Sequence, residues 1–165
     1  MILISKQGGA AMFNFKLKKI LYPTDFSEAS LEALRYAVSF ARNCTAKLIL
    51  MHVVNEKVFS EGLNFARVAA PESLEQEMTA EAGRQLKMIL PAEERQGLEW
   101  EMVILYGMPF LEIIRYAKAN DVDMIVIGTN GRSGMEHVIF GSTAEKVVRK
   151  AHCPVLSVKP AAANS

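Results

Sequence analysis

A glycine-containing segment around residue 128 carries the residues whose types and spacing could bind a phosphate group. Four apolar residues at 124–127 predict a buried strand, and Gly128 stands where that strand should end. Two residues separate Gly128 from Gly131, and nine separate Gly131 from Gly141. Glycines let backbone N–H groups approach an anion closely. The alternative interpretation is an ordinary turn that precedes a helix.

The residues after Gly141 predict a helix that begins at this loop. Ser142 opens a segment with apolar residues at helical spacing, and we expect it to cap the helix as its first residue. A helix amino terminus offers unpaired N–H donors and the positive end of the helix dipole. The strand, the glycine loop and the helix start together favour a phosphate site over a simple turn.

The carboxyl end of an earlier strand supplies a carboxylate that could complete such a site. Pro23, Thr24 and Asp25 follow an apolar run at 18–22. In open parallel sheets, ligands bind beyond the carboxyl ends of strands, where the winding reverses. If the strands at 18–22 and 124–127 are neighbours there, Asp25 faces the glycine loop and can accept hydrogen bonds from a ribose. Its competing role is to support a helix start next to Ser27.

The remaining pattern alternates between strands and helices. Apolar runs predict strands at 18–22, 48–54, 99–105, 124–127 and 154–158. Helical spacing predicts helices that begin near Ser27, Ser73, Phe110 and Ser142. This alternation predicts an α/β fold, with a three-layer open parallel sheet covered by helices on both faces. Glu99 and Glu101 alternate with apolar residues, so the strand at 99–105 is expected at a sheet edge with one wet face.

The composition is that of one globular domain. Half of the 165 residues are hydrophobic, which allows roughly 70% of the unfolded surface to be buried. A net charge of +1 gives no reason to expect a nucleic-acid or membrane partner. No apolar stretch approaches the roughly 18 residues of a membrane span. Cys44 and Cys153 show neither metal-site spacing nor a disulfide framework. We therefore expect a cytoplasmic protein with reduced thiols.

The segments outside this pattern are expected to be less regular. Residues 1–16 are expected to form a flexible N-terminal extension, in which Met12 is a candidate start. Residues 55–72 carry mixed polarity and no period, which predicts a surface loop. Residues 161–165 are expected to be a disordered tail, so that 17–160 form the domain.

Several of these motifs together resemble the universal stress protein family. They are residues 19–27, His52-Val53-Val54, Gly107-x-Pro109, Asp121-Val122-Asp123, Gly141-Ser142-Thr143 and His152 to Val155. The resemblance covers nearly the whole domain. It implies a five-stranded parallel sheet in the order 3-2-1-4-5, of the adenine nucleotide alpha hydrolase-like type. Because the glycine and serine signature is complete, it also implies the branch of the family that binds ATP.

The resemblance further implies which residues surround ATP. They are Pro23, Thr24, Asp25, Val53, Ile127, Gly128, Gly131, Arg132, Gly141, Ser142 and Thr143. The first four would lie on the adenine side, with Asp25 also placed to reach the ribose. The next two would line the ribose, and the last five would hold the triphosphate. Arg132 could equally be a solvated side chain. Any Mg²⁺ or Mn²⁺ that accompanies ATP would be held mainly by the phosphates.

No catalytic residue is identified by the sequence. No segment matches the phosphate loop that ends in Gly-Lys-Ser/Thr, and the three histidines, His52, His137 and His152, are scattered without a nucleophile nearby. An ATP-binding regulatory protein of the stress response is therefore favoured over a slow magnesium-dependent ATPase that uses the same crevice. A structural dimer with an empty pocket is the third hypothesis.

The last strand, at 154–158, predicts self-association. It is apolar and stands at a sheet edge in the expected order, and an uncovered edge invites pairing with a second copy. Family members resemble this in forming homodimers through their last strand. We therefore expect a homodimer whose interface includes Val155 and Val158, together with an unidentified regulatory protein partner.

Overall fold

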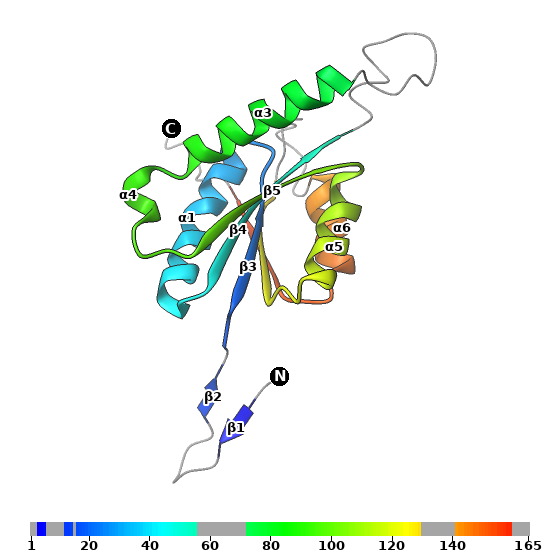
Figure 1. The fold of residues 1–165 in the computed structure, drawn as a ribbon. Coiled ribbons are helices and arrows are strands. Elements are labelled where there is room, and N and C mark those ends of the chain that lie inside the picture. The colour runs from blue at the N-terminus through cyan, green and yellow to red at the C-terminus, as the bar shows by residue number, and fades with distance from the viewer. Residues whose placement is uncertain (1–2, 6–11, 15, 56–71, 130–140, 160–165) are drawn as a thin grey trace, which may run out of the picture.

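A parallel sheet forms the centre of the protein. The computed structural model describes residues 3–5, 12–14, 16–55, 72–129 and 141–159. The sheet has five strands in the order β5-β4-β3-β6-β7 (Figure 1). These strands are β3 (Lys19–Pro23), β4 (Lys47–Val54), β5 (Trp100–Tyr106), β6 (Met124–Gly128) and β7 (Val155–Val158). The predicted order 3-2-1-4-5 and the α/β class are confirmed.

Helices cover both faces of this sheet. They are α1 (Glu28–Cys44), α3 (Glu72–Ile89), α5 (Pro109–Ala119) and α6 (Ser142–Lys150). The short helix α4 (Ala92–Arg95) follows α3 and buries no residue. Figure 1 shows α1 and α3 on one side of the sheet and α5 and α6 on the other. The helix α4 was not predicted, because a four-residue helix is too short to show an apolar period. None of the described helices is long and apolar enough to cross a membrane.

The alternation of side chains along the central strands produces two cores. In β3, Ile20 and Tyr22 belong to the cluster under α1 and α3, whereas Leu21 belongs to the cluster under α5 and α6. All three side chains are fully buried. Every residue of β5, in contrast, is only partly buried, as predicted for an edge strand.

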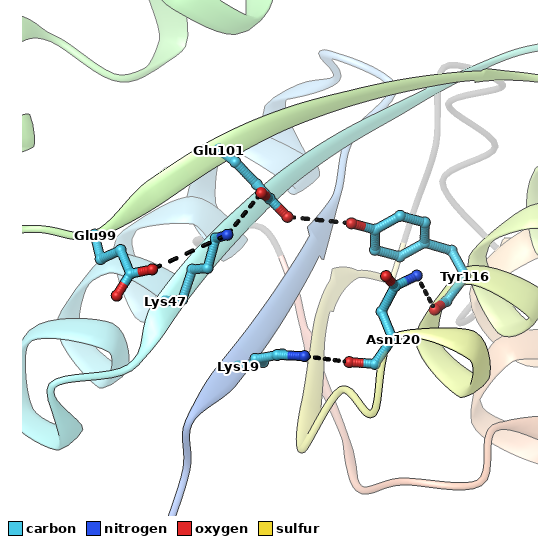
Figure 2. A network of polar contacts seen from close by, with 6 residues as sticks. All are labelled: Lys19, Lys47, Glu99, Glu101, Tyr116 and Asn120. Atoms are coloured by element: carbon cyan, nitrogen blue, oxygen red, sulfur yellow. Dashed lines mark hydrogen bonds and ion pairs between the residues drawn. The ribbon is translucent and has the colours of Figure 1, made fainter.

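Polar contacts join the layers near the amino ends of the strands (Figure 2). Lys47 Nζ lies 2.7 Å from Glu101 Oε2, and the hydroxyl of Tyr116 donates to Glu101 Oε1 at 3.2 Å. Lys19 Nζ donates to the carbonyl oxygen of Asn120 at 2.7 Å. The hydrogen bond from Lys47 to Glu101 raises the pKa of that lysine. These contacts hold the end of α5 against the sheet near the amino ends of its strands, on the side away from their carboxyl ends.

A separate antiparallel pair of strands precedes the sheet. Strands β1 (Leu3–Ser5) and β2 (Met12–Asn14) pair with each other and lie beyond the amino end of β3 (Figure 1). The sequence did not predict these strands. The flexibility expected of residues 1–16 stays a prediction, and the predicted loop and tail lie mostly outside the described residues.

The winding of the sheet reverses between β3 and β6. The chain leaves β3 to form α1 on one face, and the chain after β6 leads to α6 on the other face. Gly128, at the end of β6, allows this crossing to be tight. A Cβ atom at Gly128 would lie 2.7 Å from the backbone carbon and oxygen of Ala29 and 2.8 Å from the nitrogen of Ser30. Only a residue without a side chain fits there.

Candidate functional site

A cavity of about 380 Å³ opens at the carboxyl ends of β3, β4 and β6. The predicted site residues that line it are Pro23, Thr24, Asp25, Val53, Ile127, Gly128, Gly141, Ser142 and Thr143. The structure therefore brings together every predicted site residue within its described part. Gly131 and Arg132, as well as His137, lie outside the described residues.

The cavity also has a lining that the sequence analysis did not assign to the site. It consists of Ser30, His52, Val54, Asn55, Met78, Pro109, Ile113, Thr129 and Ala144. Several of these had a usable signal, because they directly adjoin predicted residues along the chain. Met78 had none, because it comes from α3 and reaches the cavity only through tertiary packing.

The connection between β3 and α1 forms one wall of the cavity and is firmly braced. The backbone N–H of Thr24 donates to the carbonyl of Met51 at 2.8 Å. Its hydroxyl oxygen lies 2.8 Å from Ser30 Oγ and accepts from the N–H of Phe26 at 2.9 Å. The hydroxyl of Tyr22 donates to the carbonyl of Ser30 at 2.7 Å, and burial raises the pKa of Tyr22 to about 12. Thr24 and Ser30 are themselves buried.

His52 holds this wall from the neighbouring strand. Its Nδ1 lies 2.8 Å from the carbonyl oxygen of Thr24, so Nδ1 carries the hydrogen, because a carbonyl can only accept. Its ring stacks against Phe26 with centroids 4.6 Å apart. Phe26 has a positive φ of 65°, a conformation that costs energy in residues other than glycine. The contacts of His52 and Thr24 offset this strain and hold the backbone between β3 and α1 in place.

Asp25 braces the start of α1 and also lines the cavity. Its Oδ1 accepts hydrogen bonds from the N–H of Ser27 at 3.1 Å and from the hydroxyl of Ser27 at 2.6 Å. Ser27 is the N-cap of α1, and its hydroxyl oxygen accepts from the N–H of Ser30 at 3.4 Å. Asp25 therefore supports the helix start and at the same time lines the cavity.

The amino terminus of α6 forms the opposite wall. The N–H of Gly141 donates to the carbonyl of Thr129 at 2.6 Å, and the N–H of Thr129 donates to that of Val158 at 2.8 Å. Gly141 occupies the cap position, and no side chain caps the helix. Ser142 is the first residue of α6, as predicted, but the prediction that its side chain caps the helix is wrong. The first-turn N–H groups thus lack a capping side chain at the edge of the cavity.

The site contains no cluster typical of a metal centre within the described residues. There, no group of three or more histidine, cysteine, aspartate or glutamate side chains is arranged to hold a metal ion. The polar side chains that line the cavity are instead hydroxyls, the imidazole of His52, the amide of Asn55 and the carboxylate of Asp25.

These features define an open α/β protein with a cavity at the point where its sheet reverses, the usual place of a ligand site in such folds. The model of the universal stress protein family matches residues 16–159, and the chain belongs to that family.

Individual relatives agree with this assignment. Universal stress protein MJ0577 of Methanocaldococcus jannaschii is 34% identical over 153 residues, which cover 86% of this chain and 94% of that protein. The solved structure of MJ0577 has a TM-score of 0.76 at 32% identity, covering 90% of this chain and 100% of the other.

Two solved members of the family contain adenine nucleotides. A universal stress protein in complex with cAMP has a TM-score of 0.59 at 22% identity, covering 89% of this chain and 100% of that one. One from Archaeoglobus fulgidus in complex with dAMP has a TM-score of 0.58 at 23% identity, covering 87% and 98%. At this identity the likeness establishes the shared fold.

Proposed function

We propose that the cavity binds ATP and that the protein is a cytoplasmic, nucleotide-responsive regulator of the stress response. The observation that carries the proposal is the meeting of two walls of different chemistry at one cavity. One wall presents the carboxylate of Asp25, and the other presents the amino terminus of α6 without a capping side chain. A ribose and a phosphate group require these two kinds of partner.

The rest of the lining suits a purine base. Val53, Ile113 and Ile127 are buried apolar residues, and Met78 approaches from α3. Ligand sites commonly combine such apolar walls with a few placed polar groups, and about 380 Å³ lies within their usual range of volumes. The relatives solved with cAMP and dAMP support an adenine nucleotide as the ligand class.

The contribution of Asp25 can be separated from its structural role. Asp25→Asn keeps an oxygen that can accept from Ser27 but removes the charge that strengthens hydrogen bonds from ribose hydroxyls. We expect this variant to weaken ATP binding about tenfold by isothermal titration calorimetry, since a charged acceptor contributes roughly 1.5–3 kcal/mol.

Asp123→Asn is the matched control. Asp123 accepts hydrogen bonds from the N–H groups of Lys18 and Lys19, at the end of the sheet opposite the cavity. We expect it to leave ATP affinity unchanged. Equal affinities for the wild type and Asp25→Asn would contradict the assignment of Asp25 to the ribose side. Sustained turnover of ATP by the wild type would instead support the ATPase hypothesis.

We also propose a homodimer that pairs two copies of β7. Val158 is buried within its own chain and Val155 packs against the core, so their side chains cannot supply most of such an interface. The carbonyls of Pro154 and Val158 accept hydrogen bonds from the β6 side of the sheet. The backbone groups of Val155 and Ser157 therefore face the open edge, where a second strand can pair with them.

A further inference from the structure

Two lysines share one aromatic ring beside the cavity. Lys146 Nζ lies 4.7 Å from the centroid of the Phe110 ring, and Lys150 Nζ lies 5.7 Å from the same centroid. Phe110 directly follows Pro109, which lines the cavity. The helices that carry these residues, α5 and α6, pack side by side (Figure 1). Both ammonium groups therefore lie in the layer that borders the phosphate side of the proposed site.

Lys146 can reach the mouth of the cavity from its place on α6. It stands three residues after Thr143, a cavity-lining residue, and hence on the same side of the helix. The two are separated by less than one helical pitch of about 5.4 Å. Helical side chains lean toward the amino terminus, and the four-carbon stem of a lysine spans such a distance.

The ammonium group of Lys146 contacts the ring of Phe110 and has no carboxylate partner in the described part of the chain. The carboxylates that α5 and α6 carry already pair with arginines, Glu145 with Arg149 at 3.2 Å and Glu112 with Arg115 at 3.1 Å. No ion pair involves Lys146 among the described residues. A cation over an aromatic ring at an exposed site is held weakly, whereas a hydrogen bond between an ammonium and a phosphate is stronger.

The shared ring makes Lys146 easy to release. Two ammonium groups near one ring repel each other, and Lys150 can stay on Phe110 when Lys146 leaves. Lys150 lies a further turn from the amino terminus of α6 and is correspondingly farther from the cavity. The two lysines thus differ in reach but not in charge.

We infer that Lys146 moves from Phe110 to the terminal phosphate of a bound nucleoside di- or triphosphate, and so makes the site prefer ATP to AMP. The inference rests on the proposed function, because it assigns a selectivity to the same cavity. The first phosphate meets the backbone N–H groups at the start of α6. The added phosphates extend toward the helix surface, where Lys146 supplies the opposite charge.

Calorimetric titration of ATP and of AMP into the wild type, Lys146→Gln and Lys150→Gln tests this inference. We expect Lys146→Gln to lower the affinity for ATP about tenfold and to change the affinity for AMP by less than about twofold. The reason is that a charge-assisted contact is lost only from the longer ligand. Lys150→Gln, which removes the same charge one turn away, should change neither affinity by more than about twofold. Lys146→Arg should restore most of the preference for ATP.

The outcomes separate this inference from the proposed function. If Lys146→Gln changes the affinities for ATP and AMP by the same factor, or changes neither, the role of Lys146 is overturned while nucleotide binding stands. An equal loss of ATP affinity in Lys150→Gln would also overturn it, since general attraction between ATP and the basic surface would then explain the loss without a specific contact from Lys146. If the wild type binds neither ATP nor AMP, the proposed function itself is overturned.

Discussion

At the scale of single residues, Gly128 shows how closely the fold is packed around the site. Its missing side chain allows the end of β6 to touch the backbone of α1. In Gly128→Ala, the new methyl group would collide with Ala29 and Ser30 backbone atoms, which cannot rotate away. We expect a loss of about 1–3 kcal/mol in the free energy of unfolding, measured by urea denaturation.

Gly83→Ala in α3 is the contrasting substitution. A Cβ there would meet only Ile104 Cδ1, at an ordinary contact distance of 3.8 Å. Alanine favours the helix over glycine, so this variant should be more stable than the wild type by roughly 0.5–1 kcal/mol. Similar stabilities for the two alanine variants would contradict the close approach at Gly128.

Tyrosine ionisation should control stability at alkaline pH. Burial raises the pKa of Tyr22 to about 12. Burial, together with the smaller effect of the negative charge of Glu101, raises the pKa of Tyr116 to about 12. Both values exceed the unfolded value near 10, so the folded chain holds these protons more tightly. Their contribution to stability is fully present below pH 10 and is lost as the pH rises through about 12.

Urea denaturation at pH 9 and pH 11 checks this expectation. The free energy of unfolding should fall more between these values in the wild type than in Tyr22→Phe, where one of the shifted groups is absent. Absorbance at 295 nm gives an independent reading of tyrosinate formation. Identical pH dependence in the wild type and the variant would contradict the burial of the Tyr22 hydroxyl.

At the scale of elements, the two helices that border the cavity begin in different ways. Ser27 caps α1 with its side chain, whereas Gly141 occupies the cap position of α6 and Ser142 stands inside the helix. Ser27→Ala should therefore lower the free energy of unfolding by about 1 kcal/mol. Ser142→Ala should change it by less than about 0.5 kcal/mol. Thermal and urea unfolding measure both changes. A larger loss of stability in Ser142→Ala than in Ser27→Ala would contradict these cap assignments.

The sequence predicts elements well where their apolar pattern is long. The continuous apolar runs of β4 and β6 and the helical period of α1 determine their structure almost alone, because central elements bury most of their side chains. The edge position of β5 followed from Glu99 and Glu101, which alternate with apolar residues around its start. The cap of α6 could not be predicted in this way, since either Gly141 or Ser142 is an acceptable cap and only the backbone angles decide.

The site was predictable to the extent that its residues follow strand ends. Thr24, Asp25 and Gly128 were found because parallel strands bring their carboxyl ends together. The bracing by His52 was not, because it depends on the pairing of β4 with β3 and on the left-handed backbone of Phe26. Met78 could not be found, since the sequence does not specify how α3 crosses the sheet.

At the scale of the whole molecule, the open edge of β7 gives a prediction about assembly. The N–H of Ser157 faces away from β6, so Ser157→Pro removes a donor from the edge without breaking a hydrogen bond to β6. We expect light scattering to give twice the chain mass of 18.3 kDa for the wild type and the single mass for this variant.

Ser157→Ala serves as the control for that substitution, because it alters the side chain and keeps the backbone donor. It should remain dimeric. A monomeric wild type at micromolar concentration, or a Ser157→Pro variant that folds and stays dimeric, would contradict pairing through β7.

The central claim is that the cavity between Asp25 and the start of α6 binds ATP. Its most direct measurement is to denature the purified protein, identify any released nucleotide by mass spectrometry, and titrate nucleotide-free protein with ATP by calorimetry. We predict one ATP per chain with a dissociation constant of around 1 μM, which corresponds to roughly −8 kcal/mol. Absence of both a released nucleotide and a binding signal up to millimolar ATP would contradict the claim.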